Sequence, residues 1–189
     1  AYGGSCFPKD TKAIIATDFG GNPCDWSELK KISRKYNLTL INDNCHALGS
    51  SIDNNKGYAV NFADIVIQSY HAVKNITTGE GGSILTNNKK IFKQAKLLRS
   101  HGIKKNINHS KPWEYEMLKL SSNNRLTDIQ ASLGSSQIKK LNKFVNFRRN
   151  LAKIYDKNFS NSDYFKKQKI DKENKSAYHL YPILVNFNK

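Results

Sequence analysis

Two short stretches of the chain hold side chains whose types and spacing could do chemistry. The first, NDNCH at residues 42–46, places the Asp43 carboxyl and the His46 imidazole directly after the apolar run at residues 38–42. The alternative is that Asp43 caps the following turn and His46 is a surface residue. A nucleophilic Cys45–His46 pair is disfavoured, because adjacent residues on a strand point to opposite faces.

The second stretch surrounds Lys74 in SYHAVKNITTGEGG, residues 69–82. Between residues 57 and 79 the only formally charged residues are Asp64 and Lys74, although about one residue in six of the chain is basic. Desolvation of an ammonium favours the neutral amine, which is the form that condenses with a carbonyl. The alternative is a lysine whose stem packs on apolar surface while its ammonium reaches solvent.

Other chemical motifs are weak in this sequence. GEGG at residues 79–82 lacks the Lys-Ser/Thr of a phosphate-binding P-loop and precedes a strand pattern rather than a helix. Cys6, Cys24 and Cys45 form no C-x-x-C pair, which argues against a disulfide framework and against a thiolate zinc site. We therefore expect reduced thiols and no bound metal.

The charge of the chain suggests a nucleic-acid partner at first sight. Lys and Arg number 31 against 15 Asp and Glu, a formal net charge of +16. Only five of the basic residues are Arg, whereas proteins that read bases and phosphates favour the bidentate guanidinium. A lysine-rich solvated surface fits at least as well, so we expect no nucleic acid. A basic nucleic-acid-binding α/β module and a nucleotide-binding domain without covalent chemistry are the alternatives from other classes.

Length and hydropathy predict a folded cytoplasmic protein. A chain of 189 residues can bury roughly 70% of its unfolded surface. No run approaches the ~20 apolar residues of a membrane span, and residues 1–10 lack the zones of a signal peptide. We expect no membrane segment.

The elements that must position the chemical residues alternate between strand and helix along the first half of the chain. Strands are predicted at residues 12–19, 38–42, 63–70 and 82–86. Helices are predicted after the capping pair Asp25 and Glu28, and over residues 88–100. This alternation indicates an α/β fold with a mixed, mostly parallel sheet. Ligands in such folds bind beyond the carboxyl ends of the strands, where the stretch at residues 42–46 is expected to lie.

The second half of the chain has fewer signals. Residues 104–124 are polar and irregular and predict a long loop. Thr127 and Gln130 form a capping box that opens a long helix, which continues or bends into residues 144–158. Residues 176–185 predict a final strand. In the helix over residues 88–100, Leu98 is expected to point inward.

Several dispersed segments together resemble one known family. They are LINDNCHALGS, DIVIQSYHAVKNITTGEGGSILTN, LLRSHGI, NNRLTDIQASLGSSQIKKLNKFVNFRR and YHLYPILV, in this order and spacing. The combination resembles the DegT/DnrJ/EryC1/StrS sugar aminotransferases, which use pyridoxal phosphate. His46 and the HLYPI motif are most similar to the pseudaminic acid branch, which aminates C4 of a UDP-linked 4-keto-6-deoxy-N-acetylhexosamine.

The resemblance implies a role for each matching residue. Lys74 is similar to the catalytic lysine that bonds to the cofactor, and Asp43 to the carboxylate that pairs with the pyridine nitrogen. His46 occupies the position that contacts the cofactor ring, while Ser69 resembles the hydroxyl that binds the cofactor phosphate. Asn123 matches the asparagine that reaches the neighbouring subunit, which implies a homodimer with shared active sites.

The resemblance also implies a type I fold, of which this chain is a fragment. Residues 1–140 correspond to part of the large cofactor-binding domain, and residues 141–189 to a linking helix and the start of the small C-terminal domain. The expected amino donor is glutamate, and the expected acceptor is a nucleotide-linked keto sugar for cell-surface or flagellar glycans. Because family members are considerably longer, the isolated fragment is expected to be weakly active or inactive.

A few positions depart from the family pattern. Ser121, Ser122 and Asn124 surround Asn123 where Gly and an aromatic residue are usual, and Ala72 replaces the usual Pro after His71. Relatives that perform dehydration keep the fold but typically have His at the lysine position. The presence of Lys74 therefore argues against a dehydratase.

Overall fold

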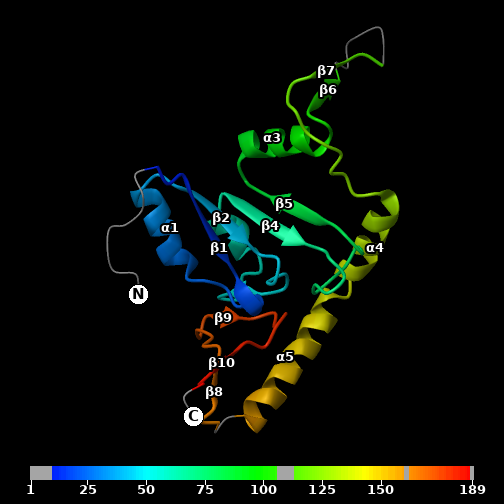
Figure 1. Ribbon diagram of the computed structural model, residues 1–189. Coiled ribbons are helices and arrows are strands. Elements are labelled where there is room, and N and C mark those ends of the chain that lie inside the picture. Colours follow the sequence, from blue (N-terminus) through cyan, green and yellow to red (C-terminus); the bar gives the residue numbers. More distant parts are fainter. Residues whose placement is uncertain (1–9, 106–112, 160–161, 188–189) are drawn as a thin grey trace.

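A four-stranded sheet forms the centre of the computed structural model, which describes residues 10–105, 113–159 and 162–187 (Figure 1). Its strands are β1 (Ala13–Thr17), β2 (Thr39–Asp43), β4 (Ile65–Ser69) and β5 (Gly82–Leu85), in the order β1-β2-β4-β5. The first three run parallel, while β5 runs antiparallel to β4. The predicted α/β fold with a mixed, mostly parallel sheet is confirmed.

Two helices connect the parallel strands. A short 3-10 turn, η1 (Phe19–Gly21), leads from β1 towards α1 (Trp26–Lys35), where Asp25 Oδ1 accepts a hydrogen bond from the Glu28 backbone N–H at 3.0 Å. The Glu28 side chain pairs with Lys31, so only half of the predicted capping box forms. The second helix, α2 (Tyr58–Phe62), was missed by the sequence patterns because it is only five residues long.

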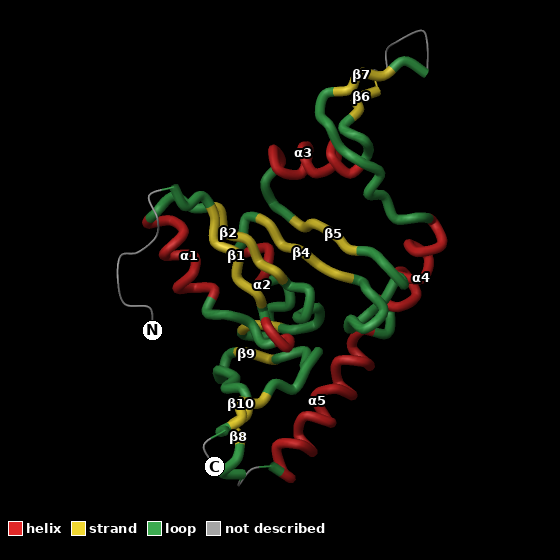
Figure 2. Tube along the Cα trace, in the orientation of Figure 1, coloured by secondary structure: helices red, strands yellow, loops and turns green. Residues whose placement is uncertain are grey.

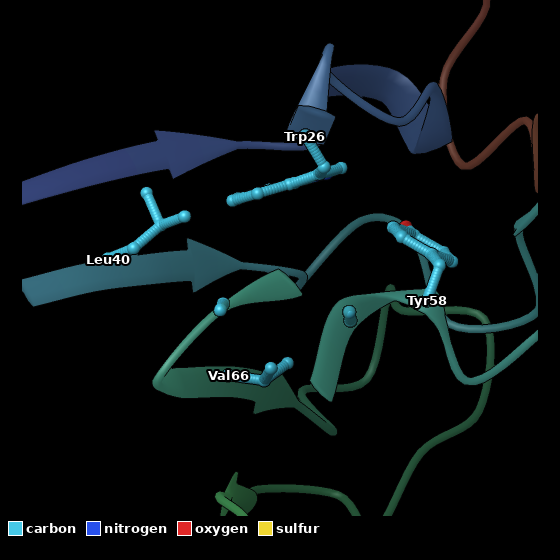
Figure 3. Packing of buried hydrophobic residues seen from close by; sticks show 6 residues of the cluster. Trp26, Leu40, Tyr58 and Val66 are labelled. Atoms are coloured by element: carbon cyan, nitrogen blue, oxygen red, sulfur yellow. The ribbon is translucent and has the colours of Figure 1, made fainter. Parts of the chain in front are cut away.

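The core lies where α1 and α2 meet the sheet (Figure 3). Trp26 of α1 and Tyr58 of α2 are almost fully buried against Leu40 of β2 and Val66 of β4. Alternation along the strands sends the neighbouring residues to the opposite face, where Ile15 is 67% exposed. The sheet is therefore covered by these helices on one face.

Trp26 makes a testable contribution to stability. Its replacement by alanine is expected to lower the free energy of unfolding by about 3–5 kcal/mol, because a large buried ring would leave a cavity. The matched control is Trp113→Ala, since Trp113 is 71% exposed and its loss should change stability by less than about 0.5 kcal/mol. Urea unfolding of both variants measures the difference, and equal losses would contradict this account of the core.

A hairpin and a helix extend beyond β5. The helix α3 (Lys89–Arg99) begins at Asn88, whose Oδ1 accepts from the Lys90 backbone N–H at 2.9 Å. Leu98 is 42% exposed, so its predicted inward position is wrong: the described elements leave that face of the helix uncovered. Gly102 has φ +67° and lies so close to Lys119 that a Cβ would meet the Lys119 carbonyl oxygen, which explains why the chain turns at a glycine.

The long loop predicted over residues 104–124 is partly wrong. The structure forms β6 (Ile103–Lys105) and β7 (Tyr115–Met117) as an antiparallel pair. Both strands are three residues long and carry charged residues, so they give no apolar alternation for a sequence pattern to detect. Cys6 and residues 106–112 lie outside the described residues.

The second half of the chain is dominated by α4 (Asp128–Ile138) and α5 (Leu141–Asn158). The capping box predicted at Thr127 and Gln130 is confirmed, with both reciprocal bonds present. The predicted bend falls at Lys139 and Lys140, between the two helices. From these helices the chain passes back towards the loops that follow β1 and β2 (Figures 1 and 2).

Three short strands follow α5. They are β8 (Phe165–Lys167), β9 (Asn174–Lys175) and β10 (Ile183–Val185); β10 pairs with β8, and β9 with β3 (Ser51–Ile52). The strand predicted over residues 176–185 forms only at its end. Residues earlier in this segment donate instead to the turn after β1. The Ala177 N–H donates to Gly21 O at 3.1 Å, and the Leu180 N–H donates to Gly20 O at 3.2 Å. Across the described ranges, no helix is long and apolar enough to cross a membrane.

Candidate active site

Asp43 is the last residue of β2, at the carboxyl end of the parallel strands. The strand register places it beside Thr17 of β1 and Ile67 of β4. Its Oδ1 accepts from the Cys45 backbone N–H at 3.1 Å, and its Oδ2 lies 3.5 Å from the Thr17 hydroxyl. The sequence placed Asp43 just after the strand, and the structure makes it the final strand residue on the sheet face away from α1 and α2.

His46 follows Asp43 in the turn after β2. Its Nδ1 accepts from the Gly20 backbone N–H at 3.4 Å, and its ring centroid lies 5.7 Å from that of Phe19 and 4.5 Å from that of His179. Burial lowers the pKa of His46, and the nearby charge of Lys74 lowers it further, against the opposing effect of Asp43. His46 is thus a half-buried member of a ring cluster whose burial favours the uncharged imidazole, rather than a surface residue.

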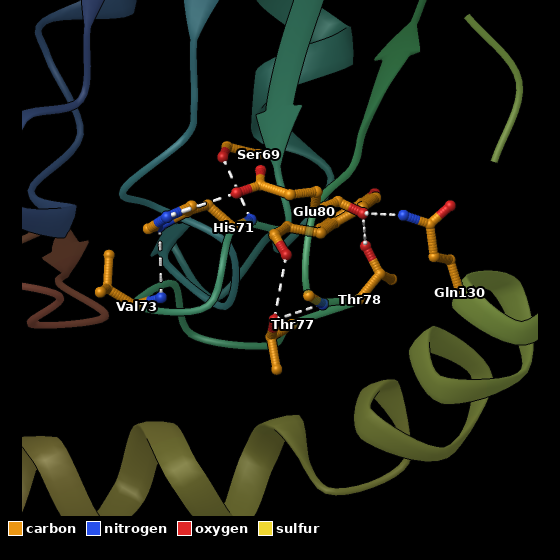
Figure 4. A network of polar contacts seen from close by, with 9 residues as sticks. Ser69, His71, Val73, Thr77, Thr78, Glu80 and Gln130 are labelled. Atoms are coloured by element: carbon orange, nitrogen blue, oxygen red, sulfur yellow. Dashed lines mark hydrogen bonds and ion pairs between the residues drawn. The ribbon is translucent and has the colours of Figure 1, made fainter. Parts of the chain in front are cut away.

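Lys74 lies in the loop between β4 and β5. Figure 4 shows hydrogen bonds that hold this loop, among them those of Thr77 and Thr78. The backbone N–H of Lys74 donates to His71 O at 3.0 Å, and the Thr78 backbone N–H donates to Tyr70 O at 2.9 Å. The loop is also tied to α4, because Gln130 Nε2 donates to Glu80 O at 3.0 Å. This bonding fixes the backbone from which the half-buried Lys74 side chain extends.

Lys74 lies close enough to Cys45 and His46 to act on both through its charge. Burial, a hydrogen bond to Asp43 and the charge of Asp43 together raise the pKa of the Cys45 thiol to about 12, against the opposing charge of Lys74. Lys74 therefore acts on Cys45 as well as on His46. A thiol with so high a pKa stays protonated at neutral pH, which is consistent with the disfavoured Cys45–His46 nucleophile.

Ser69 ends β4 and shares the sheet face of Asp43. The register pairs Asp43 with Ile67, and Ser69 lies two residues further along the strand. Its Oγ accepts from the His71 backbone N–H at 3.4 Å. Within the described part of the chain the Ser69 hydroxyl donates to no acceptor, so its hydrogen is available to a ligand.

Asn123 lies apart from these four residues. It forms an isolated bridge with Ser100 at the end of α3, and its Oδ1 accepts from the Arg125 backbone N–H at 3.3 Å. Its side chain is exposed, and in the part of the chain that the structure describes no hydrogen bond or ion pair joins it to Asp43, His46, Ser69 or Lys74. The structure thus brings together four of the five predicted site residues.

His179 belongs to the site, although sequence reasoning gave it no role. It lies in the YHLYPILV segment, and its ring packs on that of His46. Burial and, to a smaller extent, the electrostatic effects of His46, Lys74 and Arg148 together lower its pKa to about 4. Its Nδ1 is buried without a hydrogen-bond partner among the described residues. The motif itself was the available signal, but only the fold shows that it packs against residue 46.

The lowered pKa of His179 predicts a pH-dependent stability. In the unfolded chain His179 becomes protonated as the pH falls below its ordinary pKa of 6.5, whereas in the folded chain it becomes protonated only near pH 4. Stability should therefore be full above about pH 6.5 and fall as the pH drops towards 4. His179→Gln should flatten this slope in urea unfolding between pH 7 and 4.5, whereas His101→Gln, at an exposed position, should leave the slope intact. Parallel slopes in all three proteins would contradict the assignment.

A cavity of about 820 Å³ adjoins Lys74. It opens between the Lys74 loop and α5, and Lys143, Phe144 and Arg148 line its helical side. Its basic residues and aromatic ring give it a mixed character that suits an anionic, partly apolar ligand. Among the residues that the structure describes, no group of His, Cys, Asp and Glu is placed to hold a metal ion.

Comparison with known proteins assigns the chain to a family. The DegT/DnrJ/EryC1/StrS aminotransferase profile matches residues 7–189, nearly the whole chain. The chain belongs to the DegT/DnrJ/EryC1/StrS aminotransferase family. Aminotransferases of this family use pyridoxal phosphate.

Similar relatives include two enzymes with the same name. The UDP-4-amino-4,6-dideoxy-N-acetyl-beta-L-altrosamine transaminase of Campylobacter jejuni strain 81-176 is 44% identical over 177 residues, which cover 93% of this chain and 45% of the relative. The Helicobacter pylori transaminase of that name is 38% identical, with coverage of 93% and 45%. The chain thus spans about half the length of the curated relatives it matches.

Solved structures in the family share the fold. Helicobacter pylori PseC, an aminotransferase involved in the biosynthesis of pseudoaminic acid, superimposes with a TM-score of 0.85 at 36% identity, covering 96% of this chain and 47% of PseC. The PLP-form of the Streptococcus pneumoniae protein Spr1654 gives a TM-score of 0.82 at 27% identity, covering 96% and 50%.

The site residues fit the cofactor of this family. The Asp43 carboxylate could pair with a protonated ring nitrogen, and the Lys74 amine is of the type that condenses with an aldehyde. The Ser69 hydroxyl can donate to a phosphate oxygen, and the neutral imidazole of His46 offers a flat surface for the ring. Asp43 and Ser69 end β2 and β4, and His46 and Lys74 lie in the loops that follow these two strands, so the four groups fit a cofactor bound at the carboxyl end of the parallel strands.

Proposed function

We propose that the protein is a pyridoxal-phosphate-dependent aminotransferase that transfers an amino group to a nucleotide-linked 4-keto-6-deoxy sugar. The observation that carries the proposal is the joint placement of Lys74, Asp43 and His46 at the carboxyl end of the sheet, in a chain of this family. Residues 1–140 would form part of the large domain, and residues 141–189 the start of the small one.

Lys74 would do the covalent and proton-transfer work. Pyridoxal phosphate, when bound, supplies an aldehyde that condenses with amines and a ring that withdraws electrons. The Lys74 amine would hold this aldehyde and would be released by the amine substrate. The freed amine would then be the base that takes and returns a proton at the substrate carbon.

Asp43 and His46 would set the electronic state of the site. The Asp43 carboxylate would hold a proton on the pyridine nitrogen, which strengthens the electron-withdrawing character that the cofactor supplies. Its position is fixed by the Cys45 backbone N–H and by the strand register. His46, held by Gly20 N–H and by Phe19, packs its uncharged ring on the site without adding a competing cation.

Ser69 and Asn123 would make the remaining contacts. Ser69 donates its hydroxyl hydrogen to the cofactor phosphate. Asn123, exposed and apart from the other four residues, would reach the active site of the partner subunit in a homodimer. Glutamate is proposed as the amino donor, and the similarity to the altrosamine transaminases favours a UDP-linked keto sugar as the acceptor.

A labelling experiment tests the proposal. Pyridoxal phosphate is added to the full-length natural protein, the mixture is reduced with borohydride, and the peptides are analysed by mass spectrometry. The expected result is a visible absorbance band before reduction and the reduced cofactor on Lys74 afterwards. Modification spread over surface lysines such as Lys93, with none on Lys74, would refute the proposal.

A further inference from the structure

A single buried carboxylate accepts five hydrogen bonds next to the candidate site. Asp18 directly follows β1 and is fully buried, with 0% exposure. Its Oδ1 accepts from the Cys24 backbone N–H at 2.8 Å and from the Trp26 indole N–H at 2.9 Å. Its Oδ2 accepts from the Tyr58 hydroxyl at 2.6 Å. These bonds join the end of β1 to the starts of α1 and α2.

The remaining two donors flank Asp43 in the sequence. Asn42 and Asn44 donate their side-chain amides to Asp18 Oδ2, at 3.1 and 2.8 Å. Asn44 also accepts from Gln68 Nε2 at 2.6 Å, which extends the network to β4. The Asp18 backbone N–H donates to Asp43 O at 3.1 Å. Asp43 is thus held through both of its neighbours and through its own carbonyl, while its carboxylate points to the other face of the sheet.

The chemistry of this network requires a carboxylate. Burying a charge without a cation is costly, and within the described residues no ion pair joins Asp18 to a basic side chain. Five donors offset that cost, because each oxygen of a carboxylate accepts more than one hydrogen bond. An asparagine at position 18 has nearly the same shape, but it replaces one acceptor oxygen with an N–H₂ group. If that group faced the amides of Asn42 and Asn44, donor would meet donor, and these amides would have to reorient or lose a partner.

We propose that Asp18 is a positioning residue, which fixes the backbone at Asn42 and Asn44 and thereby aims the Asp43 carboxylate at the cofactor ring. The inference rests on the proposed function for the role of Asp43, but the network that carries it consists of contacts within this chain. Asp18 also directly follows Thr17, and the Thr17 hydroxyl lies 3.5 Å from Asp43 Oδ2. Asp18 therefore fixes the ends of both β1 and β2 beside the Asp43 carboxylate.

The test compares three variants of the full-length natural protein. Asp18→Asn replaces one acceptor oxygen with an N–H₂ donor. Tyr58→Phe keeps the buried ring but removes the hydroxyl, which donates to Asp18 and accepts from the Asn44 amide at 2.9 Å. Asp64→Asn is the matched control, because Asp64 also accepts a backbone N–H between strands, from Leu40 at 2.8 Å, but lies outside the network. Tyr58→Phe keeps the test valid if Asp18→Asn fails to fold.

Two readouts are measured. The first is amide hydrogen exchange of residues 42–46 without cofactor, which should rise about tenfold in Asp18→Asn and less in Tyr58→Phe. The second is the pH titration of the absorbance band after pyridoxal phosphate has been added. In Asp18→Asn its midpoint should move by about 0.5 pH unit or more, in the same direction as the midpoint moves in Asp43→Asn. Asp64→Asn should change neither, even where it lowers the melting temperature.

Two results would overturn the positioning role. One is unchanged exchange at residues 42–46 in both network variants. The other is raised exchange with a titration midpoint equal to that of the unsubstituted protein, which would make Asp18 a purely structural residue. If the unsubstituted protein forms no absorbance band, the proposed function fails instead, and the exchange measurement alone decides whether Asp18 fixes the Asp43 turn.

Discussion

Lys74→Ala is expected to abolish covalent attachment of pyridoxal phosphate and to lower kcat/KM for amino transfer by at least about 10⁴-fold. The loss is large because one amine would both hold the cofactor and move the proton. Folding should change little, since Lys74 is half-buried and its loop is held by backbone and threonine hydrogen bonds. The measurements are absorbance after cofactor addition and the initial rate of transamination.

The control for this substitution is Lys93→Ala. Lys93 is an exposed lysine on α3, far along the chain from the site loop, and its loss should leave both the band and the rate unchanged. An unchanged visible band in Lys74→Ala would show that another amine holds the cofactor. That outcome would remove the central residue of the proposed mechanism.

Asp43→Asn is expected to lower kcat/KM by about 10³-fold while cofactor binding persists. The asparagine keeps the shape of the side chain and can still accept from the Cys45 backbone N–H. It lacks the negative charge that keeps a proton on the ring nitrogen, so electrons released at the substrate carbon would be accepted poorly. Steady-state kinetics and the pH titration of the absorbance band measure the two effects.

Asp25→Asn serves as the matched control for Asp43→Asn. Asp25 caps α1, and asparagine caps helices about as well as aspartate, so stability and rate should both stay near their original values. If Asp43→Asn retained the full rate, Asp43 would be a turn-capping residue only. Its hydrogen bond to Cys45 N–H would then be its whole role, as one interpretation of the sequence allows.

The sequence predicted the parts of the fold that depend on local signals. Apolar runs placed β1, β2, β4 and β5 to within a few residues, and the Thr127–Gln130 capping box placed the start of α4. Elements without such signals were missed, among them α2 and the β6–β7 pair. The strand expected over residues 176–185 failed because those residues bond to Gly20 and Gly21, far away in the sequence.

The sequence alone singled out candidates for the chemistry, Lys74 by the scarcity of charge around it and Asp43 and His46 by their place after a strand, and the family resemblance gave them their expected roles. It could not show that Asp18 accepts five donors, or that His179 packs on His46, because those contacts join residues 6 to 133 positions apart. Hydrogen bonds and ring contacts of that kind exist only once strands and helices are packed. The composition and motifs therefore determined the chemistry available, and the tertiary structure decided which groups meet.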